Sequence, residues 1–144
     1  MPDSTRDELQ ARCDAIERAY EFQIAYAGQG LDGDVGSKSG GELRNYLTAA
    51  ERAMSDVAAV CSAVVAAEGR EPSELYRSFI DILEQDASRA RAAVRLVLAQ
   101  PTISSQLIDN LNASMHVRTI LTDLFVLDEI LKRKVAAPAP SPAS

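Results

Sequence analysis

The side chains that could do chemistry in this sequence are few, and its single histidine, His116, is the first to consider. Helical proteins that hold two metal ions use Glu-x-x-His pairs on facing helices, whereas no glutamate stands three residues before His116. A haem with His116 as its axial ligand is a second hypothesis. The neighbours Asn110, Asn112, Ser114 and Arg118 instead favour a polar helix face. We therefore predict no metal and no cofactor, and an enzyme with an unfamiliar site around His116 is the weakest hypothesis.

The two cysteines, Cys13 and Cys61, are the other candidate metal ligands and nucleophiles. Both fall on apolar stripes with helical spacing, where a free cysteine behaves as a small buried hydrophobe. One histidine and two such thiols do not make a closed four-ligand site without carboxylates. The sequence also lacks the G-x-S-x-G pattern that presents a serine nucleophile in α/β-hydrolases. These observations favour a protein without catalytic activity.

Residues 28–41 hold six of the seven glycines and one lysine, an arrangement that invites comparison with a phosphate-binding loop. Such a loop needs a glycine directly before the lysine so that backbone N–H groups surround the phosphate, and here Ser37 takes that place. A calcium loop that starts at Asp32 would need a carboxylate at its twelfth position, which is Leu43. We therefore assign no role to this segment and expect residues 29–38 to be a mobile, protease-sensitive connection.

Four helices would position these side chains, because apolar residues recur at spacings of three and four in four long segments and nowhere alternate with period two. We expect these helices at about residues 6–27, 39–68, 72–100 and 105–134. Capping boxes, Thr5 with Glu8 and Ser39 with Glu42, mark the starts of the first two. Gly69 follows the second helix, as a glycine that ends a helix commonly does.

The predicted fold class is all-α, an antiparallel up-down four-helix bundle with a glycine-rich loop between its first two helices. Residues 1–134 form its single domain. Residues 135–144 are uncharged and include three prolines, so we expect a disordered Pro/Ala tail there.

Composition and charge set further limits. The chain has 144 residues, of which 47% are hydrophobic and 25% charged, a balance typical of one globular domain. Its net charge of −6 disfavours binding to nucleic acid. No apolar run reaches the roughly 18 residues that a membrane-spanning helix needs. The start, MPDSTRDELQ, lacks the basic and apolar parts of a signal peptide, so we expect a cytoplasmic protein without membrane contact.

The segment that stands out is residues 120–131, which reads ILTDLFVLDEIL. Its apolar side chains cover most of the circumference of a helix, and a single core face uses less than that. We therefore expect part of this surface to contact a second copy of the chain or another protein. The predicted interface residues are Leu121, Phe125, Val126 and Ile130, with Val126 as the principal contact.

Together these patterns predict a non-catalytic cytoplasmic helical-bundle protein that acts through protein–protein contacts, as an accessory, adaptor or regulatory subunit, and that forms a homodimer. The alternative is a helical bundle that binds a small hydrophobic ligand or cofactor in an internal pocket. The candidate lining residues of that pocket are Tyr20, Phe22, Tyr26, Tyr76, Phe79 and His116.

Overall fold

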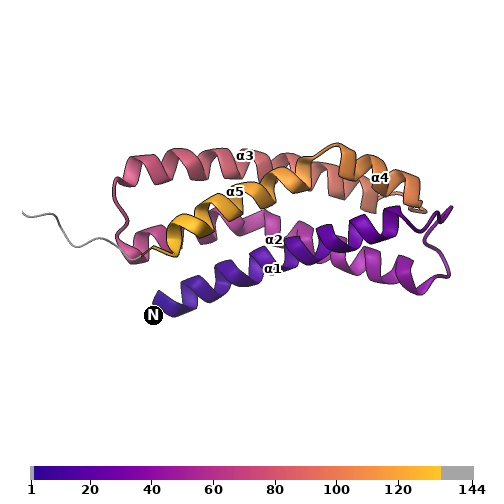
Figure 1. Cartoon of the computed structure of the whole chain (residues 1–144), viewed down its shortest axis with the longest axis horizontal. Helices are drawn as coiled ribbons and strands as arrows, with labels where there is room; N and C mark the ends of the chain where they lie inside the picture. The colour runs from indigo at the N-terminus through magenta and orange to yellow at the C-terminus, as the bar shows by residue number, and fades with distance from the viewer. Residues whose placement is uncertain (1, 134–144) are drawn as a thin grey trace, which may run out of the picture.

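The computed structural model describes residues 2–133, and the prediction of an all-α fold is confirmed (Figure 1). The helices are α1 (Pro2–Ala27), α2 (Lys38–Glu68), α3 (Ser73–Leu98), α4 (Ser105–Ala113) and α5 (His116–Leu131). Between residues 2 and 133 there is no strand. The expected count of four helices is wrong, because the last predicted helix is divided into α4 and α5. The predicted tail, residues 135–144, lies outside the described residues.

The helices lie side by side in two layers, with α1 and α2 in one and α3, α4 and α5 in the other (Figure 1). The helix α1 packs mainly on α2 and α4, and α3 packs on α2 and α5. The apolar stripes meet in one core between the layers. Its largest fully buried apolar side chains are Tyr26, Ile16, Leu43, Leu47, Leu83, Ile103, Ile108, Ile120, Leu124, Leu127 and Leu131.

The break between α4 and α5 falls at Met115, whose φ of 68° places it in the left-handed region. Two polar side chains at the end of α4 make hydrogen bonds that compete with a continued helix. The Oγ atom of Ser114 donates to the carbonyl of Leu111 at 2.6 Å, and Asn112 exchanges hydrogen bonds with Gln23 of α1 at 2.9 and 3.2 Å. Short polar side chains compete with helix continuation in this way. The break therefore lets α4 pack on α1 while α5 packs on α3.

Met115→Gly is expected to raise the free energy of unfolding by about 1 kcal/mol, because glycine enters the left-handed region without the steric penalty of a side chain. Urea unfolding followed by circular dichroism measures the change. The control is Ala113→Gly in the last turn of α4, which should lower the free energy by about 0.5–1 kcal/mol. A Met115→Gly protein less stable than the wild type would contradict the expected steric cost of the left-handed conformation at Met115.

The connection between α1 and α2 makes specific contacts at Leu31, Gly33 and Asp34, while the expected mobility and protease sensitivity of residues 29–38 stays a prediction. The backbone N–H of Leu31 donates to Ser105 Oγ at 2.9 Å, and the N–H of Ser105 donates back to the Leu31 carbonyl at 2.8 Å. Asp34 is buried. A Cβ added at Gly33 would lie 2.2 Å from Thr102 Oγ1, so close packing, not freedom of motion, explains that glycine.

The helix α2 begins earlier than expected. The residue that caps it is Ser37, whose Oγ accepts from the N–H of Gly40 at 2.9 Å, and the predicted capping box of Ser39 and Glu42 is wrong. Gly69 ends the helix as predicted, with φ 60° and its N–H donating to the carbonyl of Ala66. None of the helices in the described residues combines the length and apolar character of a membrane-spanning segment.

Both cysteines are free; Cys61 is buried and Cys13 is half-buried. Burial raises the pKa of each thiol to about 12. A thiol with such a pKa is almost entirely protonated near neutral pH and is a poor nucleophile. Neither cysteine is therefore a candidate for the functional site.

Candidate functional site

A buried carboxylate and an arginine join the loop ends at one end of the molecule. Arg44 of α2 donates from Nε to Asp34 Oδ2 at 2.5 Å, and Asp34 Oδ1 accepts the N–H of Ile103 at 2.6 Å. The same guanidinium donates to the carbonyls of Leu98 and Gln100, at 3.0 and 2.9 Å. The Arg44 guanidinium and the Ile103 N–H hold the pKa of Asp34 below its usual value despite burial. These hydrogen bonds join the connection between α1 and α2 to the C-terminus of α3 and to the residues that follow it.

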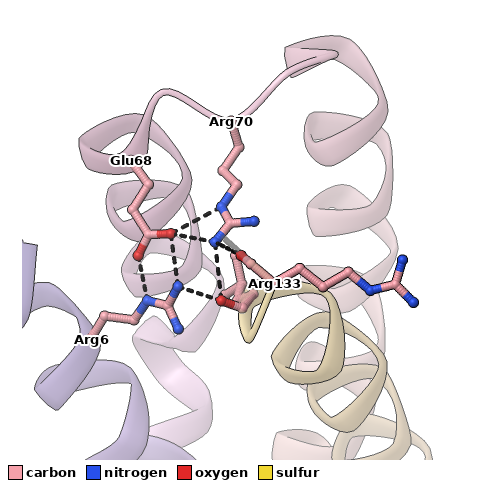
Figure 2. A network of polar contacts seen from close by, with 5 residues as sticks. Arg6, Glu68, Arg70 and Arg133 are labelled. Atoms are coloured by element: carbon pink, nitrogen blue, oxygen red, sulfur yellow. Dashed lines mark hydrogen bonds and ion pairs between the residues drawn. The ribbon is translucent and has the colours of Figure 1, made fainter. Parts of the chain in front are cut away.

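A second cluster of charged side chains joins chain segments at the opposite end of the molecule (Figure 2). Glu68, the last residue of α2, accepts hydrogen bonds from Arg6 of α1 and from Arg70. Both guanidinium groups also donate to the carbonyl of Leu131, at 2.5 and 3.0 Å, and Arg70 donates to the carbonyl of Arg133 at 2.9 Å. Arginines suit this position because cations favour the C-terminus of a helix. The cluster anchors the last turn of α5 to α1 and α2.

The buried charged groups of both clusters are therefore bound to one another and to backbone carbonyls. Among residues 2–133 there is no group of three or more His, Cys, Asp or Glu side chains placed to hold a metal ion. His116, the first residue of α5, is half-buried.

The predicted interface residues do not share one surface. Leu121 is 3% exposed and belongs to the chain's own core, so its prediction as an interface residue is wrong. Phe125 and Val126 are 50% and 45% exposed, and Ile130 is also exposed. Successive helical residues are turned by about 100°, so Phe125 and Val126 point to different sides of α5. Only one of these sides adjoins α3.

Val126 and Ile130 lie on the side of α5 that faces α3. Asp123 of α5 contacts Asp86 of α3, and Ile130 lines a cavity with residues of α3. Val126 stands three residues after Asp123 and four before Ile130, a spacing that places all three on one side of the helix. The apolar surface of α5 therefore continues onto α3.

The matching surface of α3 consists of Leu75, Phe79 and Ile82. Leu75 and Ile82 are exposed and Phe79 is half-buried. Ile82 follows Phe79 by three residues and precedes Asp86 by four, so it too lies toward α5. We call the apolar surface formed by Leu75, Phe79, Ile82, Val126 and Ile130 the α3–α5 strip.

A cavity of about 300 Å³ opens at one end of the strip. Its lining is mainly apolar and comes from α3, α5 and the connection before α3. The lining residues are Glu71, Pro72, Leu75, Tyr76, Phe79, Leu127 and Ile130. An exposed apolar surface that spans two helices in this way is typical of a contact or ligand site.

At the other end of the strip the carboxyl groups of Asp86 and Asp123 meet. Burial and the neighbouring Asp86 carboxyl raise the pKa of Asp123 to about 7. Asp123 Oδ2 is buried and has no hydrogen-bond partner among residues 2–133. Arg89 approaches the pair from α3, where its Nη1 lies 3.2 Å from Asp86 Oδ1. The strip is therefore acidic at this end.

The six residues predicted to line an internal pocket lie in different places. Tyr76 and Phe79 line the surface cavity described above. Tyr26 is fully buried, with its hydroxyl donating to the Ile103 carbonyl at 2.7 Å. Phe22 stacks on Tyr46 with ring centroids 5.0 Å apart. The remaining two are half-buried, and they are Tyr20 and His116.

Sequence reasoning missed the α3 half of the strip. Leu75, Phe79 and Ile82 widen the apolar stripe of α3, which is the same signal that singled out residues 120–131. Comparisons with protein-family models, with curated proteins and with solved structures find no match for this chain.

Proposed function

We propose that this protein acts through protein–protein contact and that the α3–α5 strip is its contact surface, with a second copy of the chain as the partner. The observation that carries the proposal is the strip itself, because its five apolar side chains span two helices and four of them are exposed in the single chain. Burying such a surface against another one is favourable in proportion to the apolar area removed from water. The proposed role is that of an accessory, adaptor or regulatory subunit.

Charge also favours a partner of this kind. Because each copy has a net charge of −6, two copies repel one another at long range. Contact between them is therefore least opposed at an apolar surface. A twofold dimer uses the same patch on both copies, and apolar side chains satisfy that requirement without opposite charges. The free thiols of Cys13 and Cys61 fit the reducing conditions of the cytoplasm, which remains the proposed location.

The second candidate function is binding of a small apolar ligand. The cavity of about 300 Å³ beside Tyr76 and Phe79 is the observation that favours it, since its lining is mainly apolar. Native mass spectrometry distinguishes the two functions. A dimer without added mass supports protein contact, whereas a monomer that carries a small molecule supports ligand binding.

Val126→Glu is expected to convert the dimer to a folded monomer. Burying an unpaired carboxylate in an interface costs several kcal/mol, and the substitution acts twice in a twofold dimer. Sedimentation velocity at tens of micromolar protein measures the mass, and circular dichroism measures the helix content.

Phe125→Glu is the matched control, because Phe125 is the neighbouring residue, is equally exposed, and points to another side of α5. It should leave the dimer intact. A wild-type protein that is monomeric at tens of micromolar would overturn the proposal. A dimer that survives Val126→Glu and dissociates on Phe125→Glu would move the contact away from the strip.

A further inference from the structure

The acidic end of the α3–α5 strip holds two carboxyl groups and only one paired arginine, Arg89. Asp86 and Asp123 face one another between α3 and α5, and the buried Oδ2 atom of Asp123 accepts no hydrogen bond from residues 2–133. Arg89 meets Asp86 on its outer side, and His116 lies two turns before Asp123 on α5. A carboxyl group held in this way gains from any cation brought close to it.

The opposite end of the strip presents a positive charge without a partner. Arg133 lies two residues beyond the end of α5. Lys132 still has right-handed helical dihedral angles and the N–H of Arg133 donates to the Ile130 carbonyl at 3.1 Å, so Arg133 sits one turn after Ile130, toward the side of α5 that carries Val126. Its carbonyl oxygen accepts from Arg70, which holds the backbone, while its guanidinium points away from that cluster (Figure 2). The exposed guanidinium makes no hydrogen bond or ion pair with the part of the chain that the structure describes.

The spacing of these residues fits a second copy in one register. Asp123 lies three residues before Val126, and Arg133 lies three residues after Ile130. When two copies of α5 run antiparallel with Val126 of one copy on Ile130 of the other, the same register brings Asp123 to Arg133. A twofold axis then makes each contact twice. A parallel pairing would instead place Asp123 against Asp123 and Arg133 against Arg133, and like charges oppose that arrangement.

Resting on the proposed function, we propose that two copies of this chain pair in an antiparallel twofold dimer in which the guanidinium of Arg133 of each copy binds the Asp86–Asp123 carboxyl pair of the other. The apolar strip supplies the attraction, and the two charged ends fix the direction and the register.

The first test is cross-linking of a mixture of two single variants, Val126→Cys and Ile130→Cys. The antiparallel register predicts a disulfide between the two different variants, several times more abundant than disulfides within either variant alone. Peptide mass spectrometry identifies the cysteines, and the native Cys13 and Cys61 react slowly because their pKa values are raised to about 12. Self-linked Val126→Cys as the main product would indicate a parallel pairing and overturn the register.

The second test compares Arg133→Gln with the control Lys132→Gln by sedimentation equilibrium. Arg133→Gln should weaken the dimer about tenfold, which corresponds to roughly 1.4 kcal/mol for the two equivalent contacts. Lys132 already pairs with Asp128 and Glu129 of its own helix, so Lys132→Gln should leave the dissociation constant unchanged. An unchanged constant for Arg133→Gln would overturn the inference.

The pH dependence gives an independent readout. A guanidinium beside Asp123 favours the ionised carboxylate, so the pKa of Asp123, about 7 in the single chain, should fall in the dimer. Dimer formation then releases protons, and the wild-type dimer should tighten as the pH rises toward 7 and change little above it. Arg133→Gln should remove that slope. If Val126→Glu dissociates the dimer and Arg133→Gln does not weaken it, the proposed charge pairing is refuted while the contact surface is supported. If the wild-type protein is a monomer, both proposals are refuted.

Discussion

Asp34→Ala is expected to lower the free energy of unfolding by about 3–5 kcal/mol, the usual cost of removing one partner of a buried ion pair. The substitution leaves Arg44 without its carboxylate and the backbone N–H of Ile103 without its acceptor. Ile103 is fully buried, so its N–H would be left as an unsatisfied buried donor, which carries its full desolvation penalty, whereas Arg44 keeps its two backbone acceptors. Urea unfolding at neutral pH measures the loss.

Asp32→Ala is the control for this prediction, because Asp32 stands in the same loop but is exposed. It should change the free energy of unfolding by less than about 0.5 kcal/mol. The pH dependence provides a check on the cause. The pKa of Asp34 is lowered in the folded state, so its contribution is present above the ordinary aspartate pKa and is lost as the pH falls through the folded-state value. Equal stabilities of Asp34→Ala and Asp32→Ala at neutral pH would contradict the role of the buried carboxylate.

The sequence predicts the helices of this protein well and their tertiary contacts poorly, and Asp34 illustrates why. The apolar spacing of three and four is local, and it locates the long helices to within a few residues. The burial of Asp34 depends on Ile103, which is 69 residues away in the chain. The local sequence of residues 28–41 therefore shows glycines and acidic residues, but it does not show that this loop is hydrogen-bonded to the connection between α3 and α4.

The break at Met115 escaped prediction for a related reason. The apolar spacing continues from α4 into α5, and no glycine or proline marks a boundary. The polar residues before Met115 weaken the helix there, but the contact between Asn112 and Gln23 decides where it ends. The surplus of apolar residues on α5 did predict an exposed surface. Which of them is covered depends on how α5 packs against α1 and α3, so the sequence could not separate the buried Leu121 from the exposed Val126.

Glu68→Ala is the other substitution from which we expect a large effect, again about 3–5 kcal/mol of lost stability. Glu68 is the carboxylate between Arg6 and Arg70, and the side chain of Arg70 is only 6% exposed. Removing Glu68 leaves a buried guanidinium whose remaining partners are backbone carbonyls of Leu131 and Arg133. The control is Glu129→Ala, an exposed residue of α5, which should change stability by less than about 0.5 kcal/mol.

The same variant tests how the cluster at Glu68 supports the last turn of α5. Arg6 and Arg70 keep the pKa of Glu68 low, so its contribution is present above the ordinary glutamate pKa and disappears as the pH falls through the folded-state value. Hydrogen exchange at neutral pH should then be faster in Glu68→Ala at the end of α5, because the arginines that bind the carbonyls there lose their fixed position. Since that turn also orients Arg133, self-association should weaken together with the protection of these amides. Unchanged exchange at residues 129–131 in a destabilised Glu68→Ala protein would show that the cluster stabilises the fold without ordering the surface that we propose for contact.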